Sequence, residues 1–110
     1  MFGRQFTSKL KPNSAAEFFR RNNTEIVPLL GKLKGFRGAT SFVAPDRKLA
    51  VVSSFWETRE DAEAYHQTNY AEVLRVLADL IEGAPKVATF EFASLTFQQS
   101  VTNVATGGIR

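Results

Sequence analysis

The spacing of hydrophobic and polar residues predicts four strands and two helices along the 110 residues. Residues 48–56, KLAVVSSFW, are rich in β-branched and aromatic residues, which is typical of a strand. Thr58 follows directly and has Asp61 three positions later, so a capped helix is expected to begin there. A strand that runs without a linker into a helix is therefore the central unit of the chain.

The first strand is expected to begin at Phe2 and to end at Leu10. These two residues and Phe6 alternate imperfectly with Arg4 and Ser8, while the odd-numbered residues point the other way. The pattern predicts a half-buried strand.

A long first helix is expected to begin at Ala15, with Ser14 and Glu17 forming a capping box. Its apolar stripe follows helical spacing and consists of Ala15, Phe19, Ile26, Leu30 and Leu33. Asn22 falls on the same stripe, so it needs a buried polar partner. Pro28 removes a backbone donor, which predicts a continuous but bent helix; the alternative is a break near Asn22 with Thr24 capping a second segment.

The second half of the chain is expected to contain two strands, a helix and a last strand. A second strand over 36–43 is joined by a Pro-Asp turn to the strand of residues 48–56, which gives an antiparallel hairpin. The helix after Trp56 is expected to end at Gly83, either continuous or with an irregularity at Gln67 to Asn69. Its inward face is predicted to carry Ala62, His66, Tyr70, Val73, Leu77 and Ile81. A last strand covers 86–97, so one domain spans residues 1–97 and residues 98–110 form a tail or arm.

The order β-α-β-β-α-β predicts an α+β, ferredoxin-like domain, with two helices on one face of an antiparallel sheet. The strand of residues 48–56 is mostly apolar on both faces. Because helices cover only one face, the other would leave a large apolar patch in water. Face-to-face pairing into a homodimer is the simplest way to bury that patch.

Composition narrows the range of functions. The chain has no cysteine and one histidine, so neither a disulfide framework nor a metal centre built from protein ligands is expected. The net charge of +3 is modest and spread along the chain, which argues against nucleic acid as a partner. No segment reads as a signal peptide or a membrane span, so a cytoplasmic protein without membrane contact is expected.

Three segments resemble the antibiotic biosynthesis monooxygenase superfamily: residues 34–38 (KGFRG), residues 55–58 (FWET) and residues 63–68 (EAYHQT). The resemblance covers about residues 2–97. It implies a dimeric α/β barrel and, as in the quinol monooxygenases of this superfamily, a cofactor-independent monooxygenase that uses dioxygen.

Catalytic positions of the superfamily are only partly kept. Where anthrone-oxidising members have an asparagine four positions before the signature tryptophan, this chain has Val52, and where they have a tyrosine six positions after it, it has Ala62; Trp56 is retained. The haem-degrading branch uses a histidine ligand where this chain has Arg75, so haem is not expected as a cofactor.

Six residues are the candidates for a site. His66 and Tyr70, one helical turn apart, are the catalytic candidates, as a proton acceptor and a phenolic donor. Four residues are expected to bind the substrate: Trp56, Asn22, Tyr65 and Phe6. Each also has an ordinary explanation as a packed core residue or, for Asn22, a helix break.

The leading hypothesis is a cofactor-independent monooxygenase acting on a small electron-rich aromatic of the quinol or anthrone type. The alternative is a non-catalytic, small-molecule-binding or stress-associated barrel that keeps the fold without the chemistry. A third hypothesis is a subunit whose apolar sheet face serves only self-association.

Overall fold

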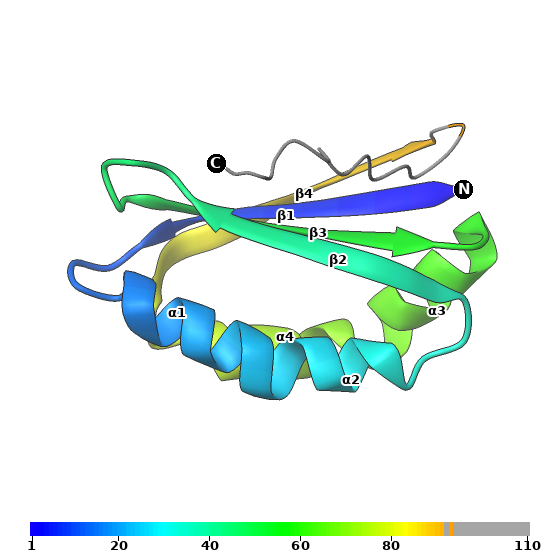
Figure 1. The fold of residues 1–110 in the computed structure, drawn as a ribbon, viewed down its shortest axis with the longest axis horizontal. Helices are drawn as coiled ribbons and strands as arrows, with labels where there is room; N and C mark the ends of the chain where they lie inside the picture. Colours follow the sequence, from blue (N-terminus) through cyan, green and yellow to red (C-terminus); the bar gives the residue numbers. More distant parts are fainter. Residues whose placement is uncertain (92, 94–110) are drawn as a thin grey trace, which may run out of the picture.

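The computed structural model of the protein describes residues 1–91 and 93. Four strands and a set of short helices follow one another in the predicted order (Figure 1). They are β1 (Phe2–Leu10), α1 (Ala15–Arg21), the π-helix η1 (Asn22–Ile26), α2 (Val27–Gly31), β2 (Phe36–Val43), β3 (Leu49–Trp56), α3 (Arg59–Thr68), α4 (Tyr70–Leu77) and β4 (Ile81–Glu91).

The strands form one antiparallel sheet in the order β2-β3-β1-β4, and all helices lie on one face of it (Figure 1). β1 and β3 are central, and the two edge strands are β2 and β4. The predicted ferredoxin-like α+β fold is therefore confirmed. Assembly into a dimeric barrel stays a prediction.

The core lies between the sheet and the helices. In the register of β1 and β3, Phe2 is opposite Trp56 and Phe6 is opposite Val52, and all four side chains are buried on the helix side. The largest fully buried side chains are Trp56, Phe18, Ile26, Leu30 and Leu77. The predicted stripe of the first helix needs one correction, because Phe18 is fully buried and Phe19 only partly.

The first helix is continuous, as predicted, and it contains a π-helical turn at η1. The N–H of Val27 donates to the carbonyl of Asn22, five residues earlier. Pro28 then lies in the first turn of α2, where its missing N–H costs little. The alternative cap at Thr24 is wrong, because its hydroxyl donates back to the carbonyl of Arg20.

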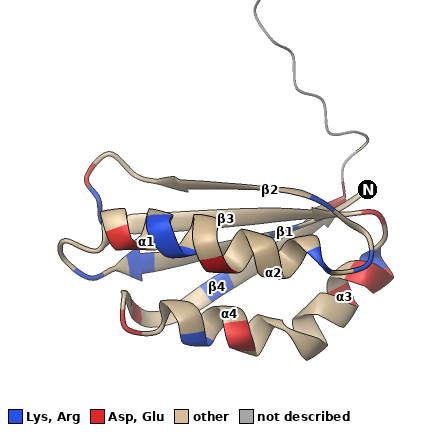
Figure 2. Ribbon diagram, turned by 60° about the horizontal axis from the view of Figure 1, so that its bottom comes forward, with Lys and Arg blue, Asp and Glu red and all other residues tan. Residues whose placement is uncertain are grey.

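The predicted capping box at Ser14 is wrong as well. Its side chain makes no capping hydrogen bond, and Glu17 bonds to Arg20 and Arg21 instead. Arg21 also donates to the Val76 carbonyl and pairs with Asp79. Opposite charges on the outer side of the helices therefore tie α1 to the end of α4 (Figure 2).

The second helical region has the irregularity at Gln67 to Asn69 that was one of the predicted alternatives, but it ends earlier than predicted. Asn69 divides it into α3 and α4, and α4 ends at Leu77 rather than near Gly83. β4 begins at Ile81, five residues earlier than expected, and Gly83 adopts a positive φ of 71° within it. The rest of the predicted last strand lies outside the described residues, except for Ala93. The predicted tail, residues 98–110, also lies outside them.

In the part of the chain that the structure describes, no helix is long and apolar enough to cross a membrane.

Candidate functional site

A small cavity lies between the sheet and the helices. Its walls are mostly apolar, and its polar groups come from β1, β3, α3 and α4. The lining residues are Arg4, Phe6, Ile26, Leu30, Val52, Ser54, Tyr65, Tyr70, Val73 and Leu77. The volume is about 20 Å³, which is room for about one water molecule. An aromatic ligand can therefore enter only if lining side chains move.

Tyr65 and Tyr70 form one side of the cavity. Tyr65 is buried on α3 and Tyr70 is half-buried at the start of α4; their ring centroids are 6.2 Å apart and their planes meet at 73°. Phe6, from β1, meets the Tyr70 ring edge-on at 6.4 Å. Three of the six predicted site residues are thus brought together around one space.

Burial reinforces the protonated state of both phenols. It raises the pKa of Tyr65 to about 12, and it raises the pKa of Tyr70 as well, although the charge of Arg4 acts in the opposite direction. Both tyrosines therefore keep their protons near neutral pH. Each can donate a hydrogen bond to a ligand, but neither is suited to be the base.

Arg4 is the polar residue that sequence reasoning missed. It is 7% exposed, and its guanidinium carbon lies 5.3 Å from the centroid of the Tyr65 ring and 4.9 Å from that of Tyr70. Both distances are within the range of cation–π attraction. A signal was available, because Arg4 shares its face of the first strand with Phe2 and Phe6.

Trp56 lies behind Tyr65 and does not line the cavity. It is fully buried, its indole ring stacks on Tyr65 with centroids 5.2 Å apart, and the Phe36 ring meets it edge-on at 5.5 Å. Its N–H donates to the Ser54 hydroxyl at 3.0 Å. Direct stacking of a substrate on Trp56 stays a prediction and requires Tyr65 to move.

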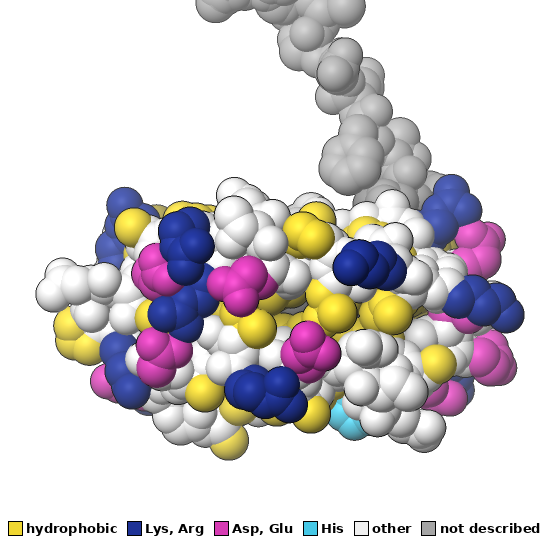
Figure 3. Space-filling model, turned by 90° about the horizontal axis from the view of Figure 1, so that it is seen from below, with side chains coloured by type: hydrophobic (Ala, Val, Ile, Leu, Met, Phe, Trp, Pro, Cys, Tyr) yellow, Lys and Arg dark blue, Asp and Glu magenta, His cyan; other side chains and the backbone are white. Residues whose placement is uncertain are grey.

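His66 is outside the cavity. The sequence placed it on the inward face of its helix, and this is wrong: its side chain is exposed, and the single histidine is visible at the surface in Figure 3. Its ring stacks on Tyr70, with centroids 5.2 Å apart and planes 26° apart. His66 therefore contacts Tyr70, which lines the cavity, but does not line the cavity itself.

Asn22 is buried, as its position on the helix stripe predicted, but it faces β2 rather than the cavity. Its amide nitrogen donates to the Ser41 hydroxyl at 2.8 Å, which is the partner a buried polar residue needs. Its side-chain oxygen, Oδ1, is buried and has no hydrogen-bond partner within residues 1–91 and 93. A role in binding substrate stays a prediction.

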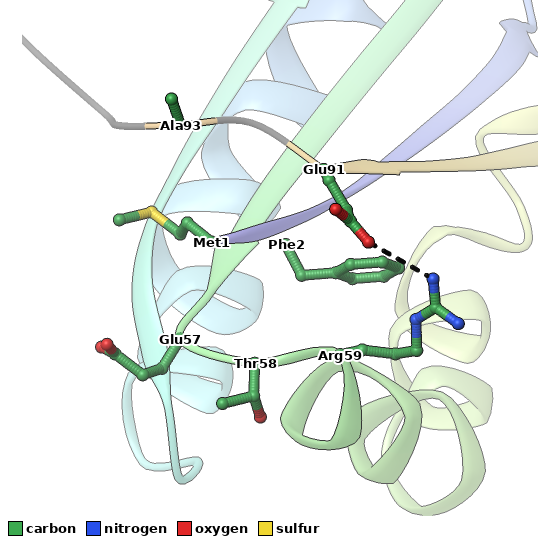
Figure 4. A pocket seen from close by; sticks show the side chains of 7 residues that line it. All are labelled: Met1, Phe2, Glu57, Thr58, Arg59, Glu91 and Ala93. Carbon is green, nitrogen blue, oxygen red and sulfur yellow. Dashed lines mark ion pairs between the residues drawn. The ribbon is translucent and has the colours of Figure 1, made fainter.

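Two hollows open at the surface beside this core. One, of about 210 Å³, is lined by Phe2, Arg4, Arg59, Ala62, Glu63 and Thr89. The other, of about 460 Å³, lies at the end of the sheet, where Arg59 reaches over the Phe2 ring and pairs with Glu91 at 3.6 Å (Figure 4). Among residues 1–91 and 93, no group of three or more His, Cys, Asp or Glu side chains could hold a metal ion.

No protein-family profile matches the sequence, and a search of curated proteins finds no match. Solved structures do match. A monooxygenase from the gene ActVA-Orf6 of Streptomyces coelicolor, determined in complex with nanaomycin D, superposes with a TM-score of 0.73 at 17% identity, covering 89% of this chain and 92% of its own.

Two structures from Nitrosomonas europaea are similar to a comparable degree. One is described as a putative antibiotic biosynthesis monooxygenase, with a TM-score of 0.69, 19% identity and coverage of 86% of this chain and 100% of that one. The other is the NE2512 protein of unknown function, with a TM-score of 0.71, 14% identity and coverage of 90% and 95%. The resemblance to antibiotic biosynthesis monooxygenases is therefore confirmed as a shared fold.

Proposed function

We propose that the protein is a monooxygenase that needs no bound cofactor and oxidises a small, electron-rich aromatic of the quinol or anthrone type with dioxygen. The observation that carries this proposal is the cavity itself, where two protonated tyrosines and a buried cation converge within an apolar wall. A few polar groups in an apolar space are the usual composition of a small-ligand site. The fold shared with a monooxygenase supports the proposal.

The proposed reaction begins with loss of an acidic proton from the substrate, which leaves an electron-rich anion. The anion passes an electron to dioxygen and the two radicals combine. In an anthrone the methylene carbon becomes a carbonyl, and in a quinol a ring C–H becomes C–OH while the hydroquinone becomes the quinone. One oxygen atom enters the product and the other leaves as water with the two hydrogens, so no external reductant is needed. The protein supplies desolvation and orientation.

The structure favours particular roles for the site residues within this proposal. Tyr70 and Tyr65 donate hydrogen bonds to the substrate oxygen, because both phenols stay protonated. Water in the cavity takes the proton first, since His66 is exposed and separated from the cavity by Tyr70. Phe6 packs against the substrate ring, and Trp56 supports Tyr65 from behind. The working unit is proposed to be a homodimer.

Oxygen uptake tests the proposal. Purified protein is supplied with anthrone or 1,4-naphthohydroquinone, and the rate is compared with the spontaneous oxidation measured beside heat-denatured protein. We expect uptake above that background, and Tyr70→Phe should lower it roughly 100-fold, as loss of a positioned donor in the transition state does. His66→Ala should lower it less.

The alternative is a non-catalytic barrel that binds a small molecule, for which an apolar cavity with few polar groups is equally suited. Binding without oxygen uptake for any quinol or anthrone would support that function. Neither binding nor uptake would leave only the hypothesis of a self-associating subunit.

A further inference from the structure

Arg4 is a buried cation without an anionic partner. Within residues 1–91 and 93, no carboxylate lies within 4.0 Å of it, and its contacts are the faces of Tyr65 and Tyr70. Burial lowers its pKa, but an arginine stays charged in any case. A charge held away from water is costly unless it is paired, so this position calls for an explanation.

The other arginines show the contrast. Four that are more exposed each pair with a carboxylate: Arg20, Arg21, Arg37 and Arg59. Arg4, at 7% exposure, is the only charged residue in the described chain that is buried, and it is left unpaired. The carboxylates therefore pair with arginines that water already solvates, and not with the arginine that is buried. A missing anion at Arg4 is the simplest reason.

Arg4 is also reachable from the surface. It lines the internal cavity together with Tyr65, and it lines the surface hollow of about 210 Å³ together with Phe2 and Thr89. Arg4 is therefore common to the linings of both spaces. A ligand in the hollow can reach the charge without unfolding the core, even though the cavity behind it holds only about one water molecule.

We propose that Arg4 binds an oxyanion carried by the substrate, and that the substrate is a small aromatic acid that enters through this hollow. This inference deepens the proposed function by naming its substrate class. A planar guanidinium matches a carboxylate with two parallel hydrogen bonds. The apolar ring of the ligand then has Phe2 and Ala62 to pack against, while the exposed carboxylate of Glu63 disfavours an anion that binds in the wrong direction.

A matched pair of ligands tests the proposal by isothermal titration calorimetry. The carboxylate is 2-naphthoate, and the neutral analogue is 2-naphthalenemethanol, which keeps the ring and one oxygen. The wild-type chain should bind 2-naphthoate about 10- to 100-fold more tightly than the alcohol, the range expected for hydrogen bonds to charged groups. Inorganic phosphate should bind far more weakly than 2-naphthoate, because it lacks the ring.

Substitutions assign the effect to Arg4. Arg4→Met keeps the length of the side chain and should remove the preference for the carboxylate while leaving affinity for the alcohol within about threefold, since only the hydrogen bonds to the charge are lost. Arg4→Lys keeps the charge but cannot donate two parallel hydrogen bonds from a planar group, so it should retain part of the preference for the carboxylate. Arg75→Met removes the same charge from the exposed side of α4 and is the control that should change neither affinity. Glu63→Gln should strengthen binding of 2-naphthoate.

Arg4→Met should also be at least as resistant to urea as the wild type, because an unpaired buried charge is replaced by an apolar chain. Equal affinity of the wild type for the two ligands, or an undiminished preference in Arg4→Met, would overturn the proposal. Tight binding of phosphate would overturn the aromatic part of it. This test measures binding and is independent of the oxygen-uptake experiment. If the chain prefers 2-naphthoate but gives no uptake with anthrone or 1,4-naphthohydroquinone, the monooxygenase is refuted and the oxyanion site stands.

Discussion

The N–H of the Trp56 indole donates to the hydroxyl of Ser54 at 3.0 Å, and both residues are buried on the same strand. Because the two residues are two positions apart, their side chains point to the same face of the sheet. The hydroxyl is thus both the partner of the indole and part of the cavity wall. The hydrogen bond that satisfies the buried indole therefore also fixes the position of a side chain in the cavity wall.

Ser54→Ala should lower the free energy of unfolding by about 1–3 kcal/mol, because the buried indole N–H loses its acceptor. Urea unfolding followed by tryptophan fluorescence measures the change. Ser53→Ala is the matched control, since Ser53 is equally buried at 6% exposure but points to the opposite face. Equal losses in the two variants would show that the bond to Trp56 carries no specific stability.

A second prediction concerns Gly35, which has a positive φ of 81°. A β-carbon at this position would collide with the carboxylate of Asp61, in the first turn of α3. Gly35→Ala should therefore destabilise the protein by about 1–3 kcal/mol, through backbone strain and the displaced Asp61. Thermal unfolding measures it.

Gly31→Ala is the control for Gly35→Ala. Gly31 lies at the end of α2, and a β-carbon added there would meet no atom within 4 Å. Alanine should therefore be neutral or stabilise the helix by up to about 1 kcal/mol. A loss at Gly31 as large as that at Gly35 would refute the steric explanation.

The order of strands and helices followed from sequence pattern because the strands are rich in β-branched and aromatic residues and the helices carry their buried residues at a period of about 3.6. The strand ending at Trp56 and the cap of Thr58, whose hydroxyl accepts from the Asp61 N–H at 3.1 Å, were predicted correctly. Gly83 was misinterpreted as a helix stop. A glycine with positive φ also fits within an irregular strand, and only the pairing of β4 with β1 distinguishes the two cases.

The candidate site was predicted only in part, because sequence pattern shows which residues face the core but not how the helices cover the sheet. Tyr65, Tyr70 and Phe6 were found because aromatic residues on apolar faces converge on the core. Arg4 was passed over because a charge in an alternating strand is usually solvated, and its burial depends on α3 and α4 covering that end of β1. His66 was misplaced because the break at Asn69 changes the helical phase between α3 and α4.

Asn22 and Ser41 give a third prediction. The side-chain amide nitrogen of Asn22 donates to the Ser41 hydroxyl, while its side-chain oxygen, Oδ1, lacks a partner within residues 1–91 and 93. Ser41→Ala should cost about 1 kcal/mol, because it leaves more of a buried amide unsatisfied. Asn22→Ala should cost less than its burial suggests, since it also removes the unsatisfied oxygen. A double-mutant cycle in urea measures the coupling, and a coupling of zero would contradict the assignment.

Acid sensitivity supplies a fourth prediction. Hydrogen bonds from Arg20 and Arg21 lower the pKa of Glu17 from its ordinary value of 4.5 to about 2. A carboxylate with a depressed pKa in the folded state stabilises the fold above its unfolded pKa, and this contribution is lost as the pH falls through the folded pKa. Stability should therefore decline between about pH 4.5 and pH 2, and Glu17→Gln should flatten that decline.

Urea unfolding at several pH values measures the effect of Glu17. Because the group is exposed, added salt should weaken it. Glu72→Gln is the control: Glu72 is exposed on α4 and has no ion-pair partner in the described part of the chain. The same flattening in Glu72→Gln would show that overall charge, and not the pairing of Glu17 with Arg20 and Arg21, is responsible.

The last prediction concerns the sheet face that no helix covers. Phe42, Leu49 and Phe90 lie on this face and are 51%, 37% and 39% exposed. Exposed large hydrophobics gathered on one face are typical of a contact surface. A second copy of the chain, packed sheet to sheet, would bury them, and a stable dimer requires about 1,200–2,000 Å² in total. Sedimentation at micromolar concentration should therefore give twice the chain mass.

Phe42→Glu should shift that equilibrium to monomers, because it places a carboxylate opposite an apolar surface with no partner. Val87→Glu is the matched control: Val87 is 38% exposed, but it pairs with Phe6 in the register of β1 and β4 and so lies on the helix side of the sheet. We expect it to remain dimeric. A wild-type monomer at all concentrations would refute the barrel, and dissociation by Val87→Glu but not by Phe42→Glu would place the interface on the other face.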